Sequence, residues 1–245
     1  MESVTWNPWH GCHKISPGCA HCYVYRLDAC HDNAAASSEC HKTGNFGLPV
    51  AKSRDRRYKI APGTEIFTCF TSDFFLEEAD AWRPDAWRMI RERSDCTFFF
   101  FTKRIARIYD CLPPDWADGY ENVTVGCTVE NQAMADSRLP VFLDAPLKHR
   151  VIGVEPMLER VDLQKYLDGR IAEVSCGGES GDEARVCDYA WVLDLRRQCV
   201  ETGTSFTYHQ TGARLCKNGR IYNIPRTVQH LQAKKAGIDY ILTGE

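Results

Sequence analysis

Short apolar runs recur along the chain, and segments with helix-like spacing of apolar residues lie between them. The runs are rich in β-branched and aromatic residues, which is typical of buried strands. Strands that alternate with helices form parallel sheets, because a parallel pair needs a crossover connection. The pattern predicts an α/β fold with about six or seven parallel strands in a partial or complete (β/α) barrel; a doubly wound open sheet is the alternative. The expected strands are residues 4–6, 65–70, 97–101, 123–129, 150–154, 171–176 and 204–208.

The chain length and the hydrophobic content predict one domain. The 245 residues, 44% of them hydrophobic, suffice for one sizeable core. Little periodicity marks residues 32–62, which are expected to be a loop insertion. The C-terminal extension, 214–245, is expected to contain a hairpin that turns at Lys217-Asn218-Gly219. The expected helices are residues 79–93, 131–139, 157–167, 184–202 (ending at Gly203) and 227–235.

The composition predicts where the protein is located and which partners its charge favours. The chain shows no signal peptide and no apolar stretch long enough to span a membrane, so a cytoplasmic location is expected. In that reducing compartment the thirteen cysteines are not expected to form disulfides. The net charge of -3 gives no support for nucleic acid or a nucleobase as partner, although neither is excluded. The basic run at 52–59 is interpreted as a solvated loop.

Polar side chains follow the apolar runs. In a barrel the carboxyl ends of the strands converge on one face, where active sites lie. The bland alternative is that strands become polar wherever they leave the core. Gly177 and Gly178 would let a ligand approach the backbone closely, because neither has a Cβ atom. The candidate residues at the strand ends are Ser72, Asp73, Lys103, Glu130, Asn131, Glu155, Glu179 and His209.

Three cysteines with the spacing Cys12-x6-Cys19-x2-Cys22 follow the first expected strand. Thiolates are soft ligands that suit iron–sulfur clusters, zinc and copper(I). A structural zinc site needs four closed ligands, and the fourth would come from His10, His13, His21, Cys30 or Cys40. A cluster held by three cysteines leaves one iron open. Spacing alone leaves three interpretations: an iron–sulfur cluster, zinc, or unligated thiols.

Tyr23 directly follows the third cysteine, and the motif lies in the first strand-to-helix loop of the expected barrel. In these respects the sequence resembles the radical S-adenosylmethionine superfamily, although the usual spacing there is Cys-x3-Cys-x2-Cys. It resembles more closely a family of phage and bacterial proteins of unassigned function that carry this three-cysteine motif. The resemblance covers Trp6-Asn7-Pro8-Trp9-His10-Gly11-Cys12, Ser16-Pro17-Gly18-Cys19, Cys22-Tyr23, Ser72-Asp73, Thr102-Lys103-Arg104, Val129-Glu130-Asn131, Glu155-Pro156, Gly177-Gly178-Glu179-Ser180-Gly181 and Gln210-x-Gly212.

The resemblance implies a radical-SAM-like barrel with a 4Fe–4S cluster on Cys12, Cys19 and Cys22. The open iron would chelate S-adenosylmethionine, and one-electron reduction would break its S–C5′ bond, giving a radical that abstracts hydrogen from an unknown substrate. Such enzymes take the electron from a donor such as flavodoxin or ferredoxin. The superfamily's usual Gly-Gly-Glu at the end of the second strand is absent here.

The resemblance also distributes roles among the candidate residues, by their position after each strand. Tyr23 would flank the adenine or the cluster. Ser72 and Asp73 would accept hydrogen bonds from the methionine ammonium, and Glu130 and Asn131 would hold the ribose hydroxyls. Gly177 and Gly178 would lie against the cofactor. The residues left for the substrate are Lys103, Glu155, Glu179 and His209.

Cys30 and Cys40 are expected not to be ligands. Cys30 lies eight residues after Cys22, about 12 Å along a helix that leaves the loop. Cys40 belongs to a polar loop that folds back more easily, so of the two it is the better candidate for a fourth ligand. A fourth thiolate would also occupy the iron position that S-adenosylmethionine needs.

Overall fold

A computed structural model describes residues 2–31 and 37–242 of the chain. Parts of the expected insertion at 32–62 and of the expected extension at 214–245 therefore lie outside the described residues. The chain forms two compact units made of non-contiguous segments. The first unit comprises Met1–His13, Val24–Gly126 and Ala145–His149, and the second comprises Lys14–Tyr23, Cys127–Asp144 and Arg150–Glu245.

Seven strands form the main sheet, in the order β1-β4-β5-β6-β7-β8-β10. All seven expected strands are confirmed, and the pairs β1–β4, β4–β5, β7–β8 and β8–β10 are parallel. Neighbours in the sheet follow one another along the chain, whereas a doubly wound sheet reverses its order near the middle. The observed order is that of a partial (β/α) barrel with β1 and β10 at its edges. The bounds are β1 Ser3–Trp6, β4 Glu65–Thr68, β5 Thr97–Thr102, β6 Val123–Thr128, β7 His149–Val154, β8 Glu173–Gly177 and β10 Ser205–Gln210.

The first unit is built around an aromatic core. The rings of Phe74 and Phe100 stack with centroids 4.5 Å apart, and Trp87 meets Phe74 edge-on. Trp87 comes from α2 (Arg83–Glu92), which is shorter than the expected helix 79–93 because Glu77–Ala79 forms a separate 3₁₀ turn. The unit's other elements are β2 (Trp9–His10), β3 (His41–Lys42), α3 (Ile108–Cys111) and all but the first residue of α1 (Tyr23–Cys30).

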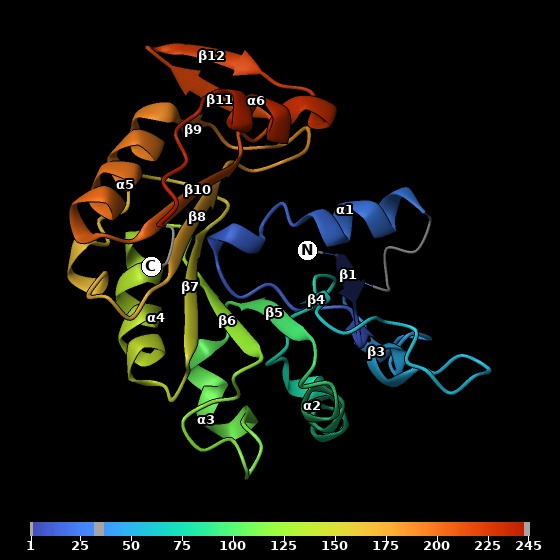
Figure 1. Cartoon of the computed structure of the whole chain (residues 1–245). Coiled ribbons are helices and arrows are strands. Elements are labelled where there is room, and N and C mark those ends of the chain that lie inside the picture. Colours follow the sequence, from blue (N-terminus) through green and yellow to red (C-terminus); the bar gives the residue numbers. More distant parts are fainter. Residues whose placement is uncertain (1, 32–36, 243–245) are drawn as a thin grey trace. The chain divides into compact units, whose positions relative to one another are not determined.

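The second unit packs helices against its strands (Figure 1): α5 (Tyr189–Thr202) contacts β8 and β10, and α6 (Gln229–Lys235) contacts β10. The Asp188 side chain caps α5 by accepting from the Ala190 amide, and Gly203 ends the helix in the left-handed conformation. This cap explains why α5 begins later than the expected residue 184. The expected hairpin is confirmed as β11 (Arg214–Lys217) and β12 (Arg220–Asn223). The remaining elements are α4 (Gln132–Asp144) and β9 (Cys187–Asp188), which pairs with β11.

The expected helix at 157–167 is wrong. The segment is irregular except for a 3₁₀ turn at Gln164–Tyr166. Its amides bond outside the segment, since Leu158 donates to the Glu130 carbonyl and Leu163 to Gln198 Oε1, at 2.9 and 2.6 Å. Its apolar side chains are buried as expected, but tertiary hydrogen bonds replace the helical ones.

The outer edge of β10 is partly covered by the end of the chain. Phe206 and Tyr240 exchange backbone hydrogen bonds of 2.6 and 2.8 Å as an antiparallel bridge. The Tyr208 amide also donates to Asp239 Oδ1, at 2.8 Å. Elsewhere in the fold, none of the helices in the described chain is both long and apolar enough to cross a membrane.

Candidate functional site

Cys12 lies in the first unit, on a loop that is bonded to the end of β4. The Gly11 amide donates to the Thr71 carbonyl at 3.2 Å, and the Ser72 hydroxyl donates to the Gly11 carbonyl. Gly11 has φ +93°, which favours glycine. The Cys12 amide donates to the Ser37 carbonyl at 2.8 Å. Backbone contacts on both sides therefore fix the position of Cys12 within this unit.

A buried arginine contacts the Cys12 sulfur. Arg104 is 7% exposed, and its Nη1 atom lies 3.4 Å from Cys12 Sγ, while Nη2 donates to the His13 carbonyl at 2.8 Å. Burial alone lowers the pKa of Arg104, but Asp73 and Cys12 outweigh it and the pKa is raised. The guanidinium therefore stays charged, and a fixed cation beside a sulfur favours the thiolate that metal binding requires.

Asp73, which follows β4, is a hub for the ends of β4 and β5. Oδ1 accepts from the Phe75 amide at 2.9 Å and from the Thr102 hydroxyl at 2.7 Å. Oδ2 accepts from the Lys103 amide at 3.0 Å and faces Arg104 Nη1 at 3.4 Å. Both oxygens of this buried carboxylate therefore have protein donors. These contacts give Asp73 a structural task beside its predicted role with the methionine ammonium, which stays a prediction.

Arg104 is a residue of the candidate site to which the sequence analysis assigns no role. Lys103 was predicted from the same stretch, but Lys103 contributes its backbone amide to Asp73, whereas Arg104 is buried against Cys12. The strand β5 ends at Thr102, and beyond a strand end the alternation of sides no longer predicts which residue turns inward. The basic pair itself was the only signal in the sequence.

Cys19 and Cys22 belong to the second unit. Pro17–Cys19 forms a 3₁₀ turn that leads into α1, and the Cys22 amide donates to the Cys19 carbonyl at 3.3 Å. Ser16 Oγ lies 3.7 Å from Cys19 Sγ. The Cys-x2-Cys segment therefore takes the form of two successive turns.

Two predicted site residues hold this turn through its backbone. Glu130, fully buried, accepts from the Gly18 amide at 3.0 Å through Oε1 and pairs with Arg138 Nη1 at 2.7 Å through Oε2. Glu179, also buried, pairs with Arg185 at 2.5 Å, and Arg185 Nη2 donates to the Pro17 carbonyl at 2.9 Å. Burial alone raises the pKa of Glu179, but bonds from Arg185 outweigh it and the pKa is lowered. Both buried acids are paired with arginines: Glu130 with buried Arg138 and Glu179 with the half-buried Arg185.

Glu155 and His209 form the most accessible acid–base pair among the predicted residues. His209 Nδ1 lies 2.8 Å from Glu155 Oε2, and Gln210 Nε2 donates to Glu155 Oε1. The bond to Glu155 raises the pKa of His209 more than burial lowers it. The ring of His230 packs 4.6 Å from that of His209. An imidazole held by a carboxylate at one nitrogen is suited to proton transfer at the other.

Gly177, Gly178 and Asn131 are accounted for by contacts within the protein, whereas Tyr23 is exposed. A Cβ atom on Gly177 would come 2.9 Å from both Glu155 and Gln210, and one on Gly178 would come 2.4 Å from the Thr211 carbonyl oxygen. The Asn131 side chain accepts from the Met134 amide at 2.9 Å, as a helix cap does. Tyr23 is 36% exposed at the start of α1. Close approach at the two glycines is thus made by protein atoms.

Most of the other cysteines are buried, whereas the predicted three are half-buried. All thirteen lie among the described residues and none is disulfide-bonded, as expected. Burial raises the pKa of Cys40 to about 12, and Cys30 is exposed at the end of α1. Cys216 is half-buried on β11. Core cysteines with a pKa raised by burial are Cys69, Cys96, Cys111, Cys176, Cys187 and Cys199.

The histidines near the motif each pair with a carboxylate. His10 lies 2.8 Å from Asp28, His13 bonds Glu78, and His21 lies 3.3 Å from Glu183. Within residues 2–31 and 37–242, no group of three or more His, Cys, Asp or Glu side chains is arranged to hold a metal ion.

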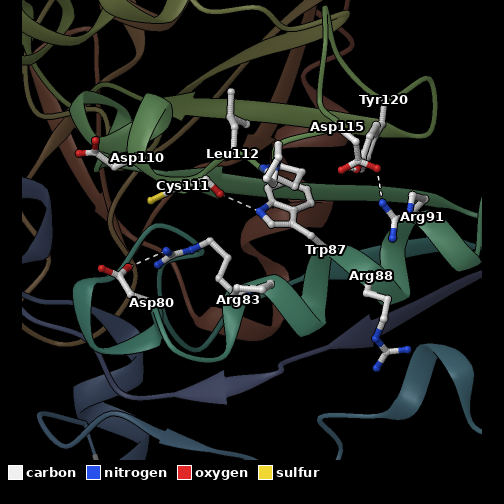
Figure 2. Close-up of a pocket in the computed structure, with 13 residues that line it drawn as sticks. Asp80, Arg83, Trp87, Arg88, Arg91, Asp110, Cys111, Leu112, Asp115 and Tyr120 are labelled. Carbon is white, nitrogen blue, oxygen red and sulfur yellow. Dashed lines mark hydrogen bonds and ion pairs between the residues drawn. The ribbon is translucent and has the colours of Figure 1, made fainter.

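A pocket of about 320 Å³ in the first unit contains none of the predicted residues (Figure 2). Its arginines face acids: Arg91 bonds Asp115, and Arg83 lies 2.6 Å from Asp80. The Trp87 indole donates to the Cys111 carbonyl at 2.7 Å. Its charged side chains are largely satisfied by one another, so the pocket does not compete with the cysteine loop as a candidate site.

Comparison with known protein families assigns the chain to one of them. The family described as "Protein of unknown function (DUF5131)" matches residues 2–240. The chain belongs to this family. No curated protein and no solved structure matches it. This family has no assigned function. The likeness to phage and bacterial proteins with the three-cysteine motif, and to radical S-adenosylmethionine enzymes, stays a prediction.

Proposed function

We propose that this DUF5131 protein binds a 4Fe–4S cluster through Cys12, Cys19 and Cys22, and binds S-adenosylmethionine for reductive cleavage. A cluster with one iron free of protein ligands supplies the electron and the binding position for the amino acid part of S-adenosylmethionine. The substrate beyond S-adenosylmethionine is not defined by the proposal.

The observation that carries the proposal is the environment of the cysteines. Cys12, Cys19 and Cys22 are half-buried on loop and turn backbone, and Cys12 has a charged arginine against its sulfur. Burial keeps Cys40 and the core thiols protonated, because it disfavours the thiolate. Cysteine thiolates are the soft donors that a cluster needs. Six residues separate Cys12 from Cys19 along the chain, and the proposal requires this loop to bring both sulfurs to one cluster.

The chain's own residues have distinct tasks in this proposal. Arg104 keeps a positive charge beside Cys12, which offsets the negative charge of a thiolate-bound cluster. Tyr23, half-exposed directly after Cys22, offers a ring against which adenine stacks. His209, oriented by Glu155, accepts or donates a proton at Nε2 for a bound substrate. Lys103 remains the predicted cation for the substrate.

The test is anaerobic reconstitution of the full chain with iron and sulfide, followed by metal analysis and spectroscopy. About four irons and four sulfides per chain, with an absorbance that bleaches on dithionite, are expected for this cluster. Addition of S-adenosylmethionine to the reduced protein should release 5′-deoxyadenosine and methionine.

Two outcomes contradict different parts of the proposal. Stoichiometric zinc in the native protein, with no iron or sulfide taken up on reconstitution, would overturn the cluster and favour a zinc-binding module. A reducible cluster that releases no 5′-deoxyadenosine would retain the cluster and remove the catalysis.

A further inference from the structure

The turn that carries Cys19 is held at two neighbouring peptide groups by charged side chains of the second unit. The Gly18 amide donates to Glu130 Oε1 at 3.0 Å, and the Pro17 carbonyl accepts from Arg185 Nη2 at 2.9 Å. One contact uses the donor of the turn and the other uses an acceptor, so together they fix both its position and its orientation.

Both charged groups are themselves fixed by buried partners. Glu130 is 0% exposed, and its second oxygen pairs with Arg138, which also donates to the Thr128 carbonyl at 2.7 Å. Arg185 is held by Glu179 at Nε and Nη2, at 2.9 and 2.5 Å. These are charge-assisted bonds on buried partners, the strongest class of hydrogen bond in a protein.

Glycine at position 18 is part of the same arrangement. A Cβ atom there would come 3.0 Å from Glu130 Cδ and 3.1 Å from Oε1. The turn therefore lies directly against the carboxylate, and a side chain at position 18 would require Glu130 to shift. A carboxylate whose two oxygens are both engaged, under a turn that covers it, has little freedom to reach a ribose.

We infer that Glu130 and Arg185 are positioning residues for the Cys19–Cys22 segment, rather than ligands of S-adenosylmethionine. They hold the Pro17–Gly18 backbone so that the thiols of Cys19 and Cys22 are presented before any metal arrives. The inference deepens the proposed function, on which it rests for the identity of the metal group. The positioning itself is testable in the metal-free protein.

The experiment compares Glu130→Gln and Arg185→Gln with the parent chain in two assays. Metal-free protein is treated with iodoacetamide, and the modification of Cys19 and Cys22 is followed by peptide mass spectrometry. Iron content is then measured after anaerobic reconstitution. Loss of one charge-assisted bond should make alkylation of both thiols on the order of tenfold faster, because the turn opens more often. Iron content should fall in both variants.

Controls within the same unit separate positioning from unfolding. Glu183→Gln removes the exposed partner of His21 in the same segment and should leave both thiols at the parent rate. Cys216, half-buried on β11, serves as the reference thiol, and buried Cys199 must stay unmodified in every variant. If Glu130→Gln exposes Cys199, Arg185→Gln decides the question, because the side chain of Arg185 is already 35% exposed and its loss is less disruptive.

The outcomes distinguish this inference from the proposed function. Parent-like alkylation and iron content, with weaker binding of S-adenosylmethionine by Glu130→Gln, would make Glu130 a cofactor ligand and overturn the inference. Faster alkylation in both variants of a chain that takes up zinc and no iron would uphold the positioning role while the proposed cluster fails.

Discussion

The two units hold their cysteines by different atoms. In the first unit a guanidinium reaches the sulfur itself, since Arg104 Nη1 lies 3.4 Å from Cys12 Sγ. In the second unit the charged side chains reach the backbone: Glu130 bonds the Gly18 amide and Arg185 the Pro17 carbonyl. A charge at the sulfur changes the chemistry of one thiol, whereas a charge on the backbone fixes where a pair of thiols lies. In the first unit a charged side chain therefore acts on the reactivity of a sulfur, whereas in the second unit charged side chains act on the position of the cysteine turn.

The largest expected effect concerns which cysteines bind iron. Cys12→Ala, Cys19→Ala and Cys22→Ala should each abolish iron uptake. This should hold although Cys12 belongs to the first unit and Cys19 and Cys22 to the second. Cys30→Ala and Cys40→Ala should keep the parent iron content, since one is exposed on α1 and burial raises the pKa of the other. Iron and sulfide per chain after anaerobic reconstitution are the measurement. Loss of the cluster in the Cys40→Ala chain would point to four-ligand coordination instead.

The next effect in size is on stability. Asp73→Ala removes the acceptor of Phe75, Thr102 and Lys103. It also leaves buried Arg104 with only the exposed carboxylate of Glu77, at 3.5 Å. We expect a loss of about 3–5 kcal/mol in the free energy of unfolding, measured by urea denaturation of the metal-free chain. Asp118→Ala, at an exposed ion pair in the same unit, should change it by less than about 0.5 kcal/mol. Equal effects of the two substitutions would show that Asp73 is not a structural hub.

A smaller effect is expected on the alkylation rate of Cys12, which should change while that of Cys19 does not. Arg104→Gln removes the cation at Cys12 and should slow alkylation of Cys12 on the order of fivefold at neutral pH. Cys19 in the same molecules should keep its parent rate, because its contacts lie in the second unit. Equal slowing of both thiols would break the comparison, and Cys19 therefore serves as the control within each sample.

The smallest expected effect is a pH dependence confined to the second unit. The bond to Glu155 raises the pKa of His209 above 6.5, so this pair stabilises the fold fully below that pH and its contribution is lost as pH rises through the folded-state pKa. Because the His209 side chain is 53% exposed, the contribution should be below about 1 kcal/mol. Glu155→Gln should flatten the change in urea stability between about pH 6 and pH 8.

The first unit supplies the contrast for that measurement. Arg104 has a raised pKa and stays charged throughout the range, so Asp73→Ala should lower stability by a similar amount at both ends of it. A His209→Asn chain that retains the parent pH profile would show that the Glu155–His209 pair is not its source.

The sequence predicted the strands well and the local roles of charged residues less well. All seven strands were recognisable because buried parallel strands are short, nearly continuous apolar runs. The segment 157–167 was misassigned because its amides bond Glu130 and Gln198, which are remote in sequence. Helical periodicity carries no information about such tertiary partners.

The candidate site shows the same limit. Glu130 and Asp73 were found because acids follow strands, but an acid that holds a backbone amide looks the same in sequence as one that awaits a ligand. Arg104 and Lys103 are adjacent basic residues, and only the fold decides which one reaches Cys12. Residue type and position after a strand therefore predict where chemistry gathers, while the partner of each side chain requires the three-dimensional structure.

The bridge between Phe206 and Tyr240 also affects how this protein behaves at high concentration. β10 is the last strand of its sheet, and its outward backbone groups are a template for pairing with another molecule. The returning chain occupies that template at Phe206, and Asp239 takes up the amide of Tyr208. A chain shortened before Asp239 would expose the outer edge of β10 to other molecules of the protein. We expect such a chain to self-associate.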